Sequence, residues 1–192
     1  MKAAPAQTVG PFFHLGLPFD GGADLVPPGS AGAIRLHGLV LDGQGAPVPD
    51  AVLELWQADP QGRIPRETGS LHRDGWTFTG WGRTATDPDG RYSFSTLEPG
   101  ATDPGRPPFF AVTVFARGLT GRLHTRAYLP ADDGLLAADP LLAADPLFAA
   151  DPLLAALPAD RRATLIAARE DRGLRFDVRL QGEGETVFLS YE

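Results

Sequence analysis

Apolar and polar residues alternate in short runs along most of the chain, and turn residues separate the runs. Ala51–Gln57 is the clearest run: Leu53 and Leu55 alternate with Glu54 and Trp56. A period of two places successive side chains on opposite faces of a β-strand. This segment is therefore predicted to be a strand with one face in a core and one face half-buried.

Similar runs, rich in β-branched, aliphatic or aromatic residues and bounded by Gly, Pro or Asp, predict seven further strands. They lie within Ile34–Asp42, Trp81–Thr86, Tyr92–Thr96, Phe109–Ala116, Leu123–Leu129, Arg175–Leu180 and Thr186–Leu189. The last two are expected to form a closing pair across residues 181–185. About eight short strands at this spacing predict a mainly β fold, a β-sandwich.

One helix is predicted in the C-terminal half. Asp160 is a favourable N-cap, Arg161–Glu170 has helical composition, and Gly173 can end the helix in the left-handed conformation.

The segment Leu135–Pro158 contains an internal repeat, Leu-Leu-Ala-Ala-Asp-Pro and close variants of it, in four copies. A proline every six residues forbids a continuous helix, although single short turns ended by Asp-Pro remain compatible with the pattern. We interpret residues 131–159 as an expanded loop, so deletion of Leu141–Pro152 is expected to be tolerated.

Residues 1–33 lack a periodic pattern and are rich in glycine and proline, with scattered aromatic residues. They form either a loose terminal arm or an irregular N-terminal arm that packs on a partner, and the clustered aromatics favour packing. Residues 34–192 would then form the sandwich domain.

The composition of the chain limits the functions that it can have. The 192 residues are 43% hydrophobic and carry a net charge of −7, which argues against nucleic acid as a partner. The absence of cysteine excludes disulfides and thiolate metal sites and suits a cytoplasmic protein. No apolar run has the length of a membrane span, and Met1–Gly10 lacks a signal pattern.

The stretch from Leu36 to Ile64 carries the most specific motif. It begins Leu-His-Gly-Leu-Val-Leu-Asp-Gly-Gln-Gly and ends Leu-Glu-Leu-Trp-Gln-Ala-Asp-Pro-Gln-Gly-Arg-Ile. It resembles the signature of the intradiol ring-cleavage dioxygenases, iron enzymes that split catechols between their hydroxyl-bearing carbons. The family signature closes on a tyrosine that binds ferric iron, where this chain has Ile64. The resemblance implies the sandwich of this family without its first iron ligand.

Further segments resemble the α subunits of the two-component, protocatechuate-cleaving branch of this family. They are Gln7–His14, Gly82–Thr86, Phe115–Leu119, Leu123–Tyr128 and Arg175–Phe188. The resemblance implies a hetero-oligomer of αβ units, in which the β subunit binds Fe(3+) and this chain contributes structure and part of the substrate pocket. The implied reaction opens protocatechuate with O2 to a carboxylated muconate.

The family's iron site consists of two tyrosines and two histidines, donors that suit a hard ferric ion. The matching positions here are Ile64, about Thr102, Phe109 and Ala111. None carries a ligand of the family set, so the resemblance implies a pocket filled with apolar side chains. The four histidines of the chain also lack metal-ligand spacing.

The resemblance implies no catalytic residue in this chain and a substrate contact made by the start of the chain and one arginine. The matching residues are Thr8, Gly10, Pro11, Phe12 and Arg117. A guanidinium suits a substrate carboxylate, and Gly10 permits close approach to a flat ring. Arg117 could instead be an ordinary surface arginine.

Two other functions compete with this interpretation. A non-catalytic β-sandwich binding module would show exposed aromatics in one groove and a stable monomer. A homomeric dioxygenase with an unconventional metal site is disfavoured by the missing ligands.

Overall fold

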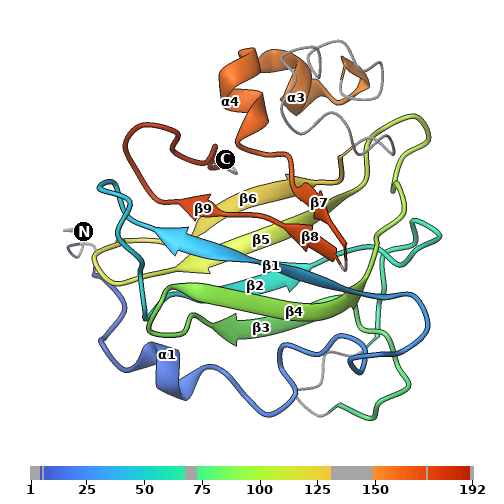
Figure 1. The fold of residues 1–192 in the computed structure, drawn as a ribbon, viewed down its shortest axis with the longest axis horizontal. Coiled ribbons are helices and arrows are strands. Elements are labelled where there is room, and N and C mark those ends of the chain that lie inside the picture. The colour runs from blue at the N-terminus through green and yellow to red at the C-terminus, as the bar shows by residue number, and fades with distance from the viewer. Residues whose placement is uncertain (1–4, 6, 68–72, 131–148, 172, 191–192) are drawn as a thin grey trace, which may run out of the picture.

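Two β-sheets face each other across one hydrophobic core (Figure 1). A computed structural model describes residues 5, 7–67, 73–130, 149–171 and 173–190. The first sheet has the order β4-β1-β8-β7, with β9 also pairing with β1, and the second has the order β3-β2-β5-β6. The strands are β1 Ala33–Leu41, β2 Val52–Trp56, β3 Trp81–Ala85, β4 Arg91–Leu97, β5 Phe109–Phe115, β6 Leu123–Tyr128, β7 Ala168–Glu170, β8 Gly173–Arg175 and β9 Val178–Arg179.

The alternation read from the sequence decides which faces form the core. Leu53 and Leu55 of β2 are fully buried, as are Leu36 of β1 and Phe94 of β4 in the facing sheet. Burying one such side chain stabilises the fold by about 1.5–3 kcal/mol. The predicted β-sandwich is confirmed, and Glu54 and Trp56 lie on the outer face of the second sheet as expected.

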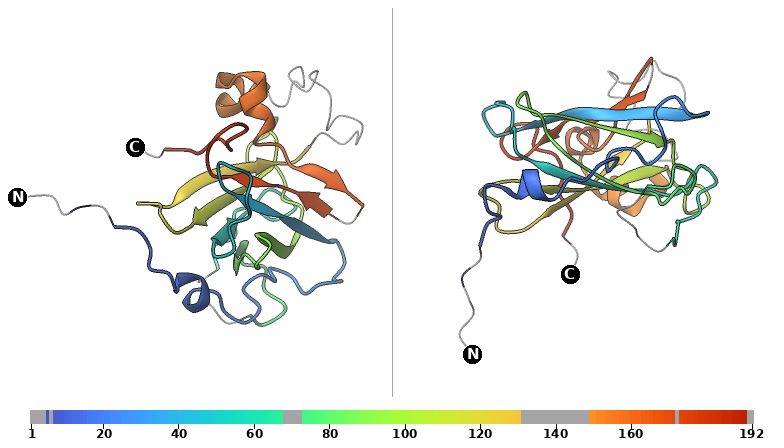
Figure 2. Two further views of the ribbon diagram at one scale, coloured as in Figure 1. Left: turned by 60° about the vertical axis from the view of Figure 1, so that its left-hand side comes forward. Right: turned by 90° about the horizontal axis from the view of Figure 1, so that it is seen from below.

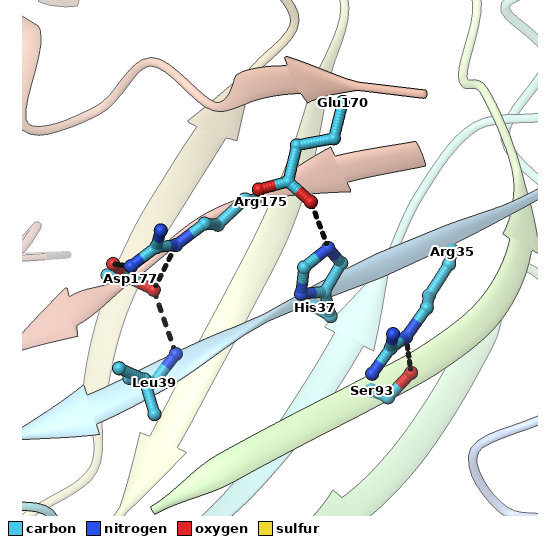
Figure 3. Close-up of polar contacts among 7 residues, drawn as sticks. All are labelled: Arg35, His37, Leu39, Ser93, Glu170, Arg175 and Asp177. Atoms are coloured by element: carbon cyan, nitrogen blue, oxygen red, sulfur yellow. Dashed lines mark hydrogen bonds and ion pairs between the residues drawn. The ribbon is translucent and has the colours of Figure 1, made fainter. Parts of the chain in front are cut away.

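The outer face of the first sheet carries paired polar side chains (Figure 3). The Asp177 carboxylate accepts the N–H of Leu39 at 2.9 Å where β1 changes partner from β8 to β9, and Arg175 binds the same carboxylate at 2.6 Å. His37 Nε2 lies 3.0 Å from Glu170 Oε2, which joins β1 to β7. These contacts stabilise the sheet, and His37 is therefore a structural histidine.

The predicted helix over Arg161–Glu170 is wrong in its second half. Helix α4 spans Ala159–Ala163 with Pro158 at its N-cap, so Asp160 lies inside the helix rather than capping it. Residues Ala168–Glu170 form β7 and pair with β8. Long-range pairing overrides the helical composition here, and Gly173 begins β8 instead of ending a helix.

The predicted closing strand Thr186–Leu189 is also wrong. Only Leu189 makes a β-bridge, and it does so with His124 of β6 rather than with Arg175–Leu180. Two contacts remain of the expected hairpin, because the Thr186 N–H donates to the Arg179 carbonyl at 3.0 Å and the Arg179 N–H donates to Thr186 Oγ1 at 2.9 Å. The C-terminal segment therefore turns away from the first sheet and runs along the edge of the second.

The end of the repeat tract packs into the fold. Residues 131–148 lie outside the described residues, but Pro152–Ala156 form helix α3. The Asp151 carboxylate accepts the N–H groups of Leu153 and Leu154, so Asp-Pro begins this helical turn, contrary to the expectation that it ends one. Leu154 is fully buried with Tyr128 in a second apolar cluster. The loop interpretation of residues 131–159 therefore fails for this last copy.

The second half of the predicted arm belongs to the sandwich. Leu25 is buried in the main core, and its N–H donates to the Ser95 carbonyl of β4 at 2.8 Å. The predicted domain boundary at residue 33 is therefore too late. A short helix, α1 Phe13–Gly16, precedes Leu25 and lies outside the two sheets in Figure 2. Among the described residues, no helix has both the length and the apolar character needed to cross a membrane.

Candidate functional site

Arg117 stands in a tight turn that follows β5. The N–H of Leu119 donates to the Ala116 carbonyl over 3.3 Å, and Gly118 has a φ of +84°. A positive φ at the third residue is typical of a type II turn, and glycine adopts it without strain. Arg117 is the second residue of the turn, and 58% of its side chain is exposed. The turn therefore presents the guanidinium at the surface.

The buried carboxylate of Asp50, two residues before β2, faces Arg117. Val52 of β2 is paired with Phe115 of β5, and continuing this antiparallel register for two residues places Asp50 opposite Arg117. Arg117 Nε forms an ion pair with Asp50 Oδ2, whose side chain is 9% exposed. Opposite charges at such cross-strand positions attract each other. Arg117 is therefore at the surface, as one interpretation of the sequence expected, but a buried acid holds it.

The N-terminal arm meets the same turn. The Gly118 N–H donates to Thr8 Oγ1 at 2.9 Å. This hydrogen bond joins two segments that are far apart in the sequence, and both of them contain predicted site residues. The structure thus brings Thr8 and Arg117 together.

Gly10, Pro11 and Phe12 follow on the exposed part of the arm. The Phe12 side chain is 74% exposed, and a Cβ atom added at Gly10 would have no neighbour within 4 Å. No crowding inside this chain therefore requires glycine at position 10. The predicted contact of these three residues with substrate stays a prediction.

A small cavity of about 140 Å³ separates the arm from the loop between β5 and β6. Its lining residues are Gln7, Val9, Phe115, Ala116, Leu119, Thr120, Gly121 and Arg122. Its volume is comparable to a cavity that holds one benzene ring, so a substituted catechol would need further space outside it. Neither Thr8 nor Arg117 lines this cavity.

The turn that closes the family signature is intact. Asp59 Oδ1 accepts the N–H groups of Gln61 and Arg63, both at 2.9 Å, and Gly62 adopts a φ of +79°. A Cβ atom at Gly62 would collide with the backbone oxygen of Ala101, so glycine is required here. The turn presents Ile64, 67% exposed, on the wall of a surface hollow of about 520 Å³.

The other positions that match iron ligands do not fit a metal ion either. Phe109 packs against Tyr128, with ring centroids 5.4 Å apart, and the Arg126 guanidinium lies 4.2 Å from its ring centre. Ala111 is paired with Arg126 on one side, and Thr102 is an exposed loop residue. Within the described ranges, no three His, Cys, Asp or Glu side chains come together in a metal-binding group. The side chains at these four positions supply no ligand set for ferric iron.

Arginine and aromatic side chains connect the arm to the outer face of the second sheet. This connection was not predicted from the sequence. Phe19 stacks on Trp81 with ring centroids 5.8 Å apart, and the Arg83 guanidinium lies 5.2 Å from the Trp81 ring. Arg83 also donates to the Leu17 carbonyl at 3.0 Å and to Glu54 Oε1 at 2.5 and 2.9 Å. Glu54 is therefore a half-buried structural acceptor. The pairing of β2 with β3, which joins Glu54 to Arg83, has no local signal in the sequence.

Two tryptophans are exposed at separate places. Trp76, 93% exposed, lines a hollow of about 600 Å³ together with Pro27 and Pro28. Trp56, 53% exposed, lies beside Trp81 on the second sheet and does not line that hollow. This arrangement differs from the single aromatic groove expected of a binding module.

His124 on β6 is held in its neutral form. Burial and the nearby Arg122 guanidinium both lower the pKa of His124. Arg122 Nε donates to Nε2 at 3.0 Å, which leaves the ring proton on Nδ1, facing Thr113 Oγ1 at 3.2 Å. His124 is thus a structural histidine.

Comparisons with known proteins agree with the fold and show the family. The model of the family described as Dioxygenase matches residues 20–182. The protocatechuate 3,4-dioxygenase alpha chain of Burkholderia cepacia is 39% identical over 206 residues, covering 98% of each chain. The beta chain of the same enzyme is 36% identical over 109 residues, covering 52% of this chain and 45% of its own length.

A solved structure shares the architecture. The dioxygenase domain of a dioxygenase and carbohydrate-binding fusion protein from Streptomyces sp. SirexAA-E is 25% identical, with a TM-score of 0.53. The match covers 83% of this chain and 87% of that domain.

Proposed function

Because the chain belongs to the intradiol dioxygenase family, we propose that it is the alpha subunit of a protocatechuate 3,4-dioxygenase. The holoenzyme would cleave protocatechuate with O2 between its two hydroxyl-bearing carbons to give 3-carboxy-cis,cis-muconate, a step in the catabolism of aromatic compounds.

The observation that carries the proposal is the extent of the match to an alpha chain. An alpha chain matches over 98% of both lengths, whereas a beta chain matches over about half of each. The same assignment explains why the Asp59–Gly62 turn is intact although Ile64 replaces a metal ligand. The chain keeps the fold of an iron enzyme and has a different task within the complex.

We assign the ferric iron to the protocatechuate 3,4-dioxygenase beta subunit. The residues of this chain at the ligand positions do not fit the ion, so none of them would coordinate the iron. The alpha chain instead supports the complex and contributes residues to the substrate pocket. We place the αβ hetero-oligomer in the cytoplasm, which the absence of cysteine suits.

The task of Arg117 follows from its charge and position. Protocatechuate is a catechol with one carboxylate, and an exposed guanidinium can bind a carboxylate through two parallel hydrogen bonds. Such a contact orients the ring and leaves the two hydroxyl groups directed away from the arginine. Thr8 fixes the arm beside Arg117, so that Gly10, Pro11 and Phe12 can border the substrate.

The exposed apolar side chains of the arm support a partner at this surface. Phe12 and Leu15 are 74% and 69% exposed in the isolated chain. Contiguous exposed apolar surface can mark a protein interface. We expect the beta chain to cover them in the complex.

Co-expression with a beta chain of the family tests the proposal. The purified complex is expected to consume protocatechuate and O2 in equal amounts and to elute as one αβ species. A stable monomer that ignores the beta chain, or a complex that leaves protocatechuate unchanged, would contradict the proposed function and favour a binding module.

A further inference from the structure

We propose that Asp50 is a positioning residue that orients Arg117 toward the substrate carboxylate. The inference rests on the proposed function, because it assigns Arg117 to substrate binding. Asp50 itself is nearly buried and would reach the substrate only through the arginine.

The backbone on both sides of Asp50 is fixed. The buried Thr86 hydroxyl donates to the Val48 carbonyl at 2.7 Å and accepts the Ala51 N–H at 3.0 Å. Ala51 is fully buried in the main core. The backbone that carries the Asp50 carboxylate is therefore held by the same framework that holds the start of β2.

The turn after β5 fixes the backbone of Arg117, the other partner of the ion pair. Arg117 lies between the buried Ala116 and Gly118, whose N–H is bound to Thr8. The ion pair with Asp50 runs through Nε, on one edge of the planar guanidinium. In the described part of the chain, no other carboxylate pairs with Arg117. The two terminal nitrogens can therefore form a bidentate contact with a carboxylate that approaches from solvent.

Preorganisation gives the expected size of the effect. An arginine free in solvent loses side-chain freedom when it binds a carboxylate, and a preset arginine has already lost part of it. Loss of this restraint should lower kcat/KM for protocatechuate about three- to tenfold. A catechol without a carboxylate does not use the guanidinium, and its kcat/KM should stay unchanged.

The test uses the αβ holoenzyme with Asp50→Asn, which keeps the shape of the side chain and removes its charge. The expected result is a raised KM for protocatechuate, an unchanged kcat, and unchanged kinetics with catechol. Asp50→Glu keeps the charge but displaces the guanidinium, so it should give an intermediate loss with protocatechuate alone. Asp89→Asn removes an exposed carboxylate that lies 4.0 Å from Arg91, and it is the matched control.

A double-mutant cycle completes the test. Once Arg117→Gln has removed the guanidinium, Asp50→Asn should cause no further loss with protocatechuate. Equal losses for both substrates, a gain in kcat/KM, or additive losses in the double variant would overturn the inference. If the wild-type complex turns over protocatechuate and Asp50→Asn has no effect, the inference fails while the proposed function stands. If the wild-type complex is inactive, the proposed function itself fails.

Discussion

Replacing Leu154 with alanine tests whether the last copy of the hexapeptide repeat is part of the fold. Leu154 is fully buried in a cluster with Tyr128, Leu165 and Val187, and helix α3 presents it from the end of the repeat tract. If the copy were an exposed loop, the substitution would change the free energy of unfolding very little.

The expected loss follows from the size of the deleted group. Leucine exceeds alanine by three carbon atoms, and at about 0.8 kcal/mol for each the transfer contribution is about 2.4 kcal/mol. A residual cavity adds to this loss, and Leu→Ala changes in cores span about 2–5 kcal/mol. Because α3 is short and lies at the edge of the fold, it can move inward and reduce the cavity. We therefore expect about 2–3 kcal/mol.

Urea denaturation of the purified chain measures this loss as a lower midpoint at unchanged slope. Leu153→Ala is the matched control, because the neighbouring Leu153 is only partly buried and should cost clearly less. A loss below about 0.5 kcal/mol for Leu154→Ala, or equal losses for both variants, would refute the packing of α3.

Two further predictions concern Thr8 in the arm and the half-buried His124. Thr8→Val removes the acceptor of the Gly118 N–H, so the hydrogen of this amide should exchange with solvent about tenfold faster. This factor follows because one hydrogen bond contributes about 0.5–1.5 kcal/mol. An unchanged exchange rate would show that other contacts hold the arm. The pKa of His124 is lowered in the folded chain, so the unfolded chain binds a proton at this residue more readily than the folded chain does. The contribution of neutral His124 to stability is therefore fully present above pH about 6.5 and declines as the pH falls below that value. The stability of the wild type relative to His124→Gln should therefore fall between pH 7.5 and 5, and a difference that does not vary with pH would contradict the assignment.

The β-sandwich could be predicted because strand patterns are local. In β2 the alternation of Leu53 and Leu55 with Glu54 and Trp56 places two side chains in the core and two on the outer face, as observed. The segment Arg161–Glu170 could not be predicted in the same way. The N–H of Tyr128 donates to the Leu165 carbonyl at 2.8 Å, and β7 pairs with β8, so distant partners end the helix early.

The repeat tract shows a second limit of local patterns. Asp-Pro fits the end of a turn and the start of a helix equally well, since Asp can cap a helix and Pro suits its first position. In the structure a helix starts at Asp151, because this arrangement buries Leu154.

The site was only partly accessible from the sequence. The resemblance to the family indicated Thr8 and Arg117. In the structure Arg117 precedes Gly118 in the turn, and Thr8 accepts the Gly118 N–H. It did not indicate Asp50, because the ion pair depends on the register between β2 and β5. That register is a tertiary property, and no spacing within the chain encodes it.

The most direct test of the account is the iron content of this chain, purified alone and together with its beta subunit. We expect no iron and no visible absorbance in the chain alone, because Ile64, Phe109 and Ala111 offer no side-chain ligand. The complex should contain stoichiometric ferric iron and show the colour of tyrosinate-to-iron charge transfer. Stoichiometric iron with visible absorbance in the chain alone would contradict the account.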